Sequence, residues 1–433
     1  MRTASIRSGT GRLRVNSPAT NAPLTRSGTP PYAWLCVGLL WVVWLLNYLD
    51  RQVIFSVFPL LQAELKLTPV QLGLISTAFL WVYAVAGPFA GYFADRFGCK
   101  RMIVVSLAVW SAVTWLTGQA RTLSELLAAR ALMGISEACY LPAALALIAA
   151  WHSEKTRAKA TGLHYSGGYL GMIIGGGLGG WMAQHYGWRA AFLILGSIGV
   201  AYSFVLAFTL RDRKREQSIT RSSSQSFLSA ARSVFQLPGY PSMFAVFASI
   251  SVGNWIVYTW LPLYLFERFG MGLDKAGFTA TFYLQAGSFA GILIGGAVAD
   301  RWVLHNPRGR LLTQAIGLAA AAPFLFLSGF TSSVALLTVG MAIFGFGRGI
   351  YDANCMPALC QIAPETLRGT GFGMFNFIGP FTGGIVAAGA GALKSSIGIG
   401  GSLEIAGVLV AMSALVLARV SPGIPVNIQR RSL

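Results

Sequence analysis

Apolar stretches long enough to cross a lipid bilayer recur twelve times between residues 33 and 420. A spanning helix needs about 20 mostly apolar residues, and backbone hydrogen bonds inside a bilayer are satisfied only in helices or closed barrels. We therefore predict an all-α membrane protein with twelve transmembrane helices. Their predicted ranges are 33–58, 70–93, 102–119, 123–150, 160–183, 188–210, 241–266, 276–299, 310–328, 332–360, 368–392 and 398–420.

The composition agrees with a membrane protein. Of the 433 residues, 55% are hydrophobic and 11% are charged, whereas about a quarter of a soluble domain is charged. The net charge of +19 is not gathered in a compact basic domain, so we expect no nucleic-acid partner. No nucleotide-binding loop, metal-ligand cluster or nucleophile–base spacing is evident, and the chain is predicted not to be an enzyme and to need no cofactor.

The positive charges predict the orientation in the membrane. If both termini are cytoplasmic, 24 of the 33 Lys and Arg residues lie on that side and 6 on the other, and cytoplasmic loops are enriched in these residues. We therefore expect a multi-pass protein, of the inner membrane if bacterial, with both termini in the cytoplasm. Segment 1–32 is interpreted as a cytoplasmic tail, with a transit peptide as the alternative.

An internal repeat predicts two halves. The matching pairs are GYFADR (91–96) with GAVADR (296–301), GISEACYLPA (134–143) with GIYDANCMPA (349–358), and EKTRAKATG (154–162) with ETLRGTGFG (365–373). The offsets are 205, 215 and 211, in the same order, so charged residues recur in register. We expect six-helix bundles at 33–210 and 241–420, a charged cytoplasmic linker at 211–240 and a cytoplasmic tail at 421–433.

Three motifs carry a family resemblance. GYFADRFGCKR (91–101) is similar to the loop signature between helices 2 and 3 of the major facilitator superfamily, LAARALMGISEA (127–138) to its fourth-helix pattern, and GWRAAF (187–192) to its usual start of helix 6. The resemblance implies two pseudo-symmetric six-helix bundles that alternate access to a central site. Within the superfamily, NYLDRQ with RALMGISEACY resembles the anion:cation symporters of sugar acids and carboxylates, and equally the spinster-like transporters.

The resemblance implies a conformational gate in the loop motif. In the superfamily this element holds the outward-facing state, which assigns that role to Gly91, Asp95, Arg96 and Gly98. Asp300 and Arg301 occupy the equivalent place in the second half. A plain stop-transfer role, the alternative, needs only the positive charges.

The most informative ionisable residues inside predicted spans are Asp50, Arg51, Arg130, Glu137, Arg348 and Asp352. A charge at the bilayer centre costs roughly 2.5–3.5 kcal/mol on insertion scales, and such residues usually mark functional sites. In the family the helices that carry them line the central cavity. The alternative is a set of neutralised ion pairs that only specify packing.

Helical geometry suggests partners for these charges. Asp50 and Arg51 are neighbours and point about 100° apart, so they cannot face the same group. We expect Asp50 to pair with Arg130 and Arg51 to receive the substrate anion, while Arg348 and Asp352, four residues apart, can pair directly. The family resemblance makes Asp50 and Glu137 proton sites with Arg130 as a partner, and Glu137, with no adjacent base, is the expected proton carrier.

Polar and aromatic residues complete the predicted substrate site. Beside Arg51, Arg348 and Asp352, the candidates are Tyr48, Tyr83, Tyr140, Tyr165, Asn254, Tyr258 and Asn376. Sugar-acid symporters carry a glutamine where this chain has Gly168, which is a departure from their pattern. Gly167, Gly171, Gly175 and Gly179 share one face of helix 5 and predict either static close packing or a sliding surface.

The sequence therefore predicts a secondary active transporter, a proton-coupled symporter of a small organic anion (a carboxylate or sugar acid) that works by alternating access. The alternatives are a spinster-like lysolipid or amphiphile transporter, an efflux antiporter, and a receptor on the same fold. We expect a monomer in the lipid bilayer whose partners are the small-molecule anion and, as the coupling ion, protons.

Overall fold

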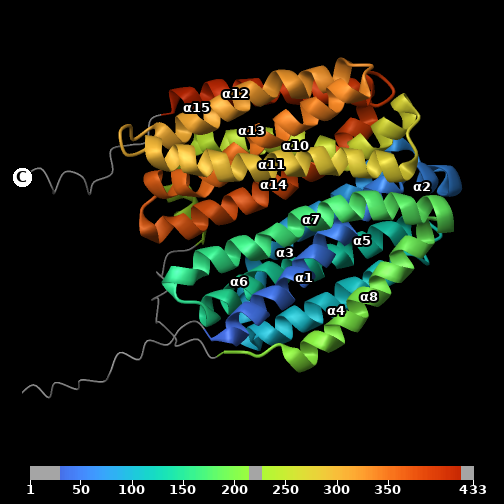
Figure 1. Cartoon of the computed structure of the whole chain (residues 1–433), viewed down its shortest axis with the longest axis horizontal. Helices are drawn as coiled ribbons and strands as arrows, with labels where there is room; N and C mark the ends of the chain where they lie inside the picture. The colour runs from blue at the N-terminus through green and yellow to red at the C-terminus, as the bar shows by residue number, and fades with distance from the viewer. Residues whose placement is uncertain (1–29, 214–226, 421–433) are drawn as a thin grey trace, which may run out of the picture.

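The computed structural model describes residues 30–213 and 227–420, which form fifteen helices and no strand (Figure 1). The helices of the first half are α1 Pro31–Ser56, α2 Phe58–Leu65, α3 Pro69–Phe97, α4 Cys99–Thr117, α5 Leu123–Ala138, α6 Tyr140–Trp151, α7 Glu154–Tyr186 and α8 Trp188–Thr209. Those of the second half are α9 Phe227–Phe235, α10 Tyr240–Phe269, α11 Leu273–Trp302, α12 Gly309–Phe330, α13 Val334–Ile362, α14 Glu365–Leu393 and α15 Gly398–Arg419.

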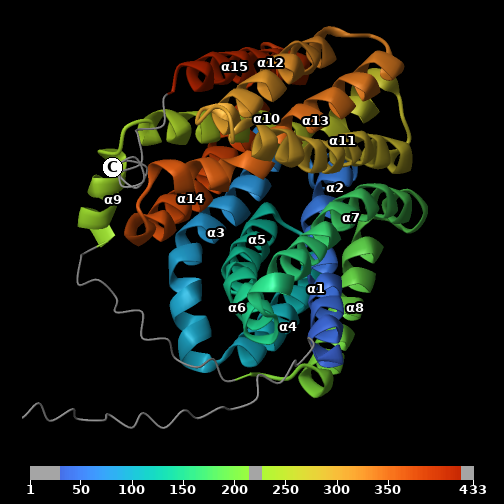
Figure 2. The ribbon, with the colours of Figure 1, turned by 60° about the vertical axis from the view of Figure 1, so that its left-hand side comes forward.

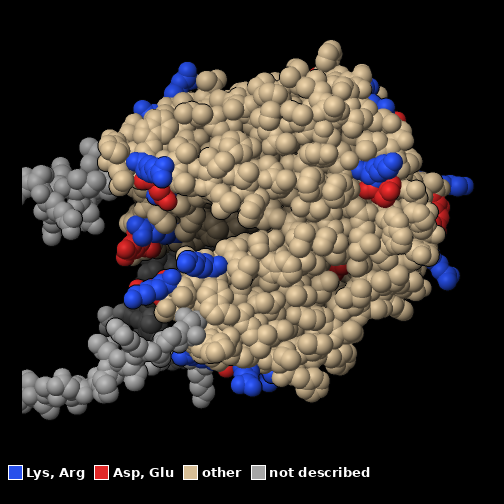
Figure 3. Space-filling model, in the orientation of Figure 1, with Lys and Arg blue, Asp and Glu red and all other residues tan. Residues whose placement is uncertain are grey.

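The helices gather into two bundles, one made of α1–α8 and the other of α10–α15 (Figures 1 and 2). Eleven segments among the described residues are long and apolar enough to cross a membrane. Helix α7 is not among them although it has 33 residues, because its many glycines lower the mean hydropathy. The charged side chains gather at the two ends of the face in Figure 3, and the belt between them is nearly free of Lys, Arg, Asp and Glu, as expected of a membrane-spanning protein.

Two helix breaks lie next to a proline, one at the end of the first predicted span and one inside the fourth. The first span ends at Ser56 and restarts as α2, which has Pro59 at its second position. The fourth is divided into α5 and α6 at Cys139, three residues before Pro142. Proline has no N–H to donate to the carbonyl one turn earlier, so the helical ladder is broken there. The second break directly follows Glu137, one of the buried charges.

The predicted linker 211–240 contains a short helix that the sequence analysis does not foresee. Helix α9 lies beside α14 in Figure 2. Its sequence FLSAARSVF places Ala231, Val234 and Phe235 on one side, and Val234 is fully buried. The ring of Phe235 packs 5.0 Å from that of Phe244 on α10. This apolar spacing is the signal that identifies the helix.

The glycine face of α7 packs closely against α1, as both a static contact and a sliding surface require. A Cβ placed on Gly171 would lie 2.3 Å from the carbonyl oxygen of Leu45, and one on Gly175 would lie 2.7 Å from that of Leu49. Only residues without a side chain allow backbones to approach so closely. The contact fixes the rotation of α1, and therefore the directions of Asp50 and Arg51.

The two halves touch at the end of the molecule where α2 lies. A Cβ on Gly176 of α7 would lie 2.4 Å from the carbonyl oxygen of Gly277 of α11, and one on Gly73 of α3 would lie 2.3 Å from that of Ala387 of α14. Thr77 also donates to the carbonyl oxygen of Gly384 at 2.6 Å. At the opposite end the surface is hollowed between the halves (Figure 3). The molecule is thus closed at the α2 end and open at the other.

Candidate functional site

An ion pair between α1 and α5 is the centre of the first half. Arg51 Nε donates to Glu137 Oε2 at 2.5 Å. The Glu137 side chain is fully buried and that of Arg51 is 14% exposed. The expectation that Glu137 has no adjacent base is therefore wrong, because the guanidinium comes from a residue 86 positions away in the chain.

Three aromatic rings surround the Arg51 guanidinium. Its Cζ lies 5.1 Å from the ring centroid of Tyr48, 4.8 Å from that of Phe79 and 4.7 Å from that of Tyr83. Cation–π contacts of this kind gain strength in a desolvated setting. One nitrogen of the guanidinium, Nη2, is buried without a hydrogen-bond partner. Arg51 is therefore held by rings on one side and by one carboxylate on the other.

Asp50 faces a different neighbour, as the helical geometry predicts. It is 2% exposed, and its Oδ2 accepts from Thr114 Oγ1 of α4 at 3.4 Å, while its Oδ1 has no hydrogen-bond partner. The expected Asp50–Arg130 ion pair is wrong: among the described residues no oxygen of Asp50 lies within 4.0 Å of a guanidinium nitrogen of Arg130. Arg130 instead donates from Nη1 to Met133 Sδ at 3.2 Å.

In the second half, Arg348 is the centre of a smaller polar group. Its Nε lies 3.2 Å from Asp352 Oδ2, which confirms the predicted pair along α13, and its Nη1 donates to the hydroxyl of Tyr258. Gln285 of α11 contacts the same hydroxyl at 3.4 Å, and its own Oε1 is buried without a partner. Unlike Glu137, the Asp352 side chain is 32% exposed.

A cavity of about 630 Å³ lies between the halves, next to Arg348. Helices α1 and α7 form one wall, and α11 and α13 form the other. The lining residues are Trp44, Tyr48, Gly162, Leu163, Tyr165, Ser166, Gly168, Tyr169, Met172, Gln285, Phe289, Ile292, Leu293, Arg348, Asp352 and Ala353. A concave, mostly apolar space with a few convergent polar groups is the usual form of a small-molecule site.

The structure divides the predicted substrate residues into two groups. Four of them line the cavity: Tyr48, Tyr165, Arg348 and Asp352. Tyr258 does not line it, but its hydroxyl accepts a hydrogen bond from Arg348. Five others do not line it: Arg51, Tyr83, Tyr140, Asn254 and Asn376.

The reasons differ for these five. Arg51 and Tyr83 belong to the ion-pair cluster, by which we mean Arg51, Glu137 and the rings around the guanidinium. Tyr140 is fully buried: its hydroxyl donates to the carbonyl oxygen of Leu40 at 2.8 Å and lies 3.0 Å from His164 Nε2. Asn254 is half-buried on α10, and Asn376 is exposed on α14.

Sequence reasoning did not single out two aromatic residues of the cavity. Trp44 and Tyr169 carry no charge, and their apolar neighbours make them look like ordinary packing residues. Trp44 is held in place by ring contacts, since its centroid lies 5.3 Å from that of His164 and 5.7 Å from that of Tyr140. Trp44 comes four residues before Tyr48, and Tyr169 comes four residues after Tyr165. This spacing is the signal that places each pair on one helix face.

The predicted gate residues lie at the ends of spanning helices. Gly98 has φ +87° and ends α3, and its N–H donates to the carbonyl oxygen of Ala94 at 3.1 Å. Asp300 pairs with Arg310 at 2.6 Å rather than with Arg301, whose side chain is exposed. The guanidinium of Arg96 lies 5.8 Å from the ring centroid of Phe97. The surroundings of Gly91 and of the Asp95 side chain lie outside the described part of the structure.

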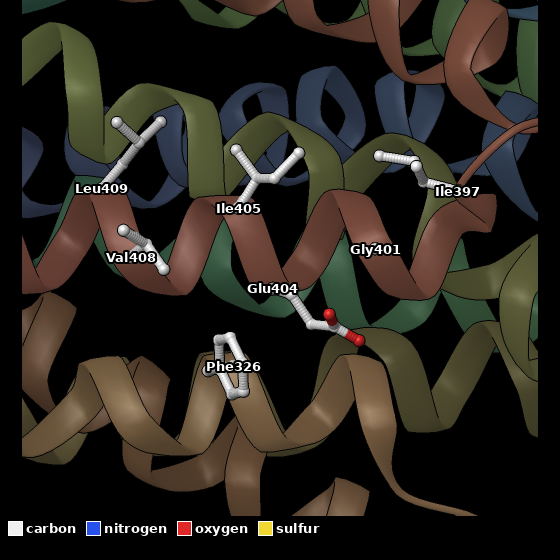
Figure 4. A pocket seen from close by; sticks show the side chains of 7 residues that line it. All are labelled: Phe326, Ile397, Gly401, Glu404, Ile405, Val408 and Leu409. Atoms are coloured by element: carbon white, nitrogen blue, oxygen red, sulfur yellow. The ribbon is translucent and has the colours of Figure 1, made fainter.

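A second hollow, of about 470 Å³, lies on the outer face between α12 and α15 (Figure 4). Figure 4 shows the Glu404 carboxylate on the side of α15 that faces the Phe326 ring of α12, with Val408 on the same side, whereas Ile397, Ile405 and Leu409 lie on the other side of the α15 ribbon. Glu404 lies in the predicted span 398–420 and is a further ionisable residue that the sequence analysis overlooks. No residue of the ion-pair cluster or of the central cavity lines this groove.

Comparison with known proteins identifies the family. The model of the Major Facilitator Superfamily matches residues 40–388. The chain belongs to this superfamily. The major facilitator fold accounts for the two bundles, the repeat and the cavity between the halves, as the resemblance of the sequence motifs implies. The relatives below are transporters, and the family is one of transporters rather than enzymes.

Two curated relatives within the superfamily are transporters of organic anions. The chain is 27% identical over 415 residues to the probable galactarate/D-glucarate transporter GudP of Bacillus subtilis, covering 87% of this chain and 90% of that protein. It is 27% identical to the probable sulfoacetate transporter SauU of Cupriavidus necator, covering 87% and 93%. These similarities support an organic-anion transporter.

A solved major facilitator structure has the same fold. The crystal structure of a bacterial homologue of the human lysosomal transporter Spinster, in an inward-facing and occupied conformation, matches with a TM-score of 0.76. The two chains are 20% identical, and the match covers 90% of this chain and 97% of the other. At this level of identity the likeness shows the fold alone.

Proposed function

We propose that the protein is a proton-coupled symporter of a small organic anion that works by alternating access. The observation that supports this most is the buried Arg51–Glu137 ion pair, whose guanidinium stacks on Tyr48 at the cavity wall. Breaking a buried pair is costly when one charge is left alone. A proton on Glu137 leaves Arg51 as the uncompensated charge, and a substrate anion that pairs with Arg51 removes the cost.

This exchange of partners couples the two cargoes. Asp50, Arg51, Arg130 and Glu137 together are formally neutral, and they stay neutral when one proton and one anion bind. Either cargo alone leaves a net charge in a desolvated site, which is unfavourable. The site is therefore expected to change conformation either empty or with both cargoes bound, which is the requirement for symport.

The conformation agrees with that of a transporter whose cavity is open to one side of the membrane and closed to the other. The halves meet at the α2 end through Gly176 and Gly277, and the surface is hollowed at the other end. If both termini are cytoplasmic, as the charge bias predicts, the open end faces the cytoplasm. The two six-helix halves then rock about the cavity to expose the other side.

The test is transport by Glu137→Gln in proteoliposomes, with galactarate, galactonate, sulfoacetate and 4-hydroxybenzoate as candidate anions. Wild type is expected to accumulate one of them when an inward proton gradient is applied. The variant is expected to lose accumulation while it still exchanges the same anion across the membrane at equal pH.

Glu365→Gln is the matched control, because that carboxylate is 89% exposed at the start of α14. It should accumulate the anion as wild type does. Full proton-driven accumulation by Glu137→Gln would contradict the role proposed for this residue.

An amphiphile transporter is the second candidate. One observation favours it: the α11 wall of the cavity is apolar, and Leu293 on that wall is 60% exposed. It predicts that lysolipids compete with the anions for uptake. Failure of lysophosphatidylcholine to inhibit would exclude it.

A further inference from the structure

Resting on the proposed symport, we propose that the substrate is a monovalent anion with a ring-sized apolar body and a hydroxyl group, rather than a dicarboxylate polyol. Three features of the cavity support this class of substrate: its net charge, the aromatic shelf over Gly168, and one unpartnered amide oxygen. None of them depends on which relatives the chain resembles.

The charges of the cavity fit one negative charge. Arg348 and Asp352 are the charged residues on its wall, and they already neutralise each other at 3.2 Å. With Glu137 protonated, Arg51 adds one positive charge beside Tyr48. A single carboxylate balances that charge, whereas a second one would be desolvated without a partner.

The aromatic shelf consists of Trp44, Tyr48 and Tyr165, and it lies where a side chain at position 168 of α7 would be. A Cβ on Gly168 would lie 2.8 Å from Trp44 Nε1 and 2.9 Å from Tyr48 Cδ2, so both rings lie directly against the helix backbone. The two rings contact each other edge to face, with centroids 4.8 Å apart. Tyr165 adds a third ring beside Trp44 at 6.0 Å. A planar ring of the substrate can make stacked or edge-to-face contacts with these surfaces.

The opposite wall is also apolar. Phe289, Ile292 and Leu293 of α11 face the cavity across from the aromatic shelf, and Met172 of α7 closes the space beside them. A polyol placed between these walls would lose hydrogen bonds to water without replacing them. Burial between the same walls stabilises an apolar ring, because its apolar surface leaves water.

One polar group on the wall is left for a hydroxyl. Gln285 is 1% exposed, and its Nε2 lies 2.6 Å from Met172 Sδ, whereas its Oε1 has no partner. Buried polar atoms are normally hydrogen-bonded. A substrate hydroxyl can donate to this oxygen, within the group formed by Gln285, Tyr258 and Arg348.

The test is competition by added probes for uptake of the anion that wild-type proteoliposomes accumulate, with the thermal shift of the purified protein as a second readout. The probes are 4-hydroxybenzoate, benzoate, galactonate, galactarate and lysophosphatidylcholine. We expect 4-hydroxybenzoate to inhibit and stabilise most, benzoate next, and galactarate least. Stronger effects of galactarate or galactonate would overturn this inference and leave the proposed symport standing, whereas no anion effect at any pH, or preference for the lysolipid, would overturn both.

Gly168→Ala tests the shelf directly. The added methyl must displace Trp44 or Tyr48, and a methyl group in a substrate pocket changes affinity by about tenfold or more. Gly38→Ala is the matched control, because a Cβ on Gly38 of α1 meets nothing within 4 Å. We expect the inhibition constant of 4-hydroxybenzoate to rise in Gly168→Ala and not in Gly38→Ala. Equal constants in the two variants would contradict the shelf, and the wild-type ranking remains decisive if Gly168→Ala does not fold.

Discussion

Glu137 and Asp352 occupy the same position of the internal repeat, in GISEACYLPA and GIYDANCMPA, yet they have opposite surroundings. Glu137 is fully buried and pairs with an arginine of another helix, Arg51 of α1. Asp352 is 32% exposed and pairs with Arg348 one turn earlier on its own helix. Duplication has therefore kept an acid in each half and changed its partner.

The difference assigns different work to the halves. A pair between two helices can change the packing of the bundle when it opens, so the Arg51–Glu137 pair suits a proton-linked switch. A pair within one helix leaves the bundle unchanged, so the Arg348–Asp352 pair suits substrate binding. The predictions below test this contrast through stability and affinity.

The largest effect is expected for Arg51→Met. The variant leaves Glu137 charged in a buried site without its partner, which typically costs about 3–5 kcal/mol of unfolding free energy. Denaturant unfolding of the purified protein measures it. The double variant Arg51→Met/Glu137→Met should recover most of the loss, because two apolar residues of similar size replace the pair. A single variant as stable as wild type would contradict the contrast.

A smaller effect on stability is expected for Arg348→Met. Asp352 can still reach water through the cavity, so the loss should resemble that of an exposed pair, about 0–1 kcal/mol. The affinity for the anion should fall by about tenfold or more, since each 1.4 kcal/mol of lost contact is a factor of ten. Anion-induced thermal shifts measure the affinity. Unchanged affinity would remove Arg348 from the substrate site.

The smallest effect concerns the α2 end. Trp188 Nε1 donates to Glu64 Oε2 at 2.6 Å and Arg189 pairs with the same carboxylate, and these contacts lower the pKa of Glu64. A lowered pKa in the folded state means that the stabilisation is present above the ordinary pKa of 4.5 and is lost as the pH falls through the folded-state value. Glu64→Gln should therefore reduce the acid sensitivity of the melting temperature slightly.

Glu267 is the matched comparison in the second half, since it pairs with Lys394 at 2.6 Å at the same end. The fall of the melting temperature at acid pH should differ less from wild type in Glu267→Gln than in Glu64→Gln. The reverse order would contradict the role of the Trp188 hydrogen bond.

Much of the fold could be predicted from the sequence, because span length and the positions of charges depend on local composition. The Arg348–Asp352 pair could be predicted for the same reason, since residues four apart on a helix lie next to each other on its surface. The divergence of Asp50 and Arg51 also follows from helical geometry. The partner of Arg51 could not be predicted, because it depends on how the glycine face of α7 sets the rotation of α1 against α5.

The measurement that tests the central claim most directly is the number of protons taken up when the anion binds. It can be read with a pH indicator in weakly buffered detergent solution, using the anion of highest affinity from the competition panel. Wild type should take up about one proton for each anion bound, as coupled binding at a formally neutral site requires. Glu137→Gln should bind the anion and take up none. Proton uptake by Glu137→Gln equal to that of wild type would show that the Arg51–Glu137 pair is not the switch.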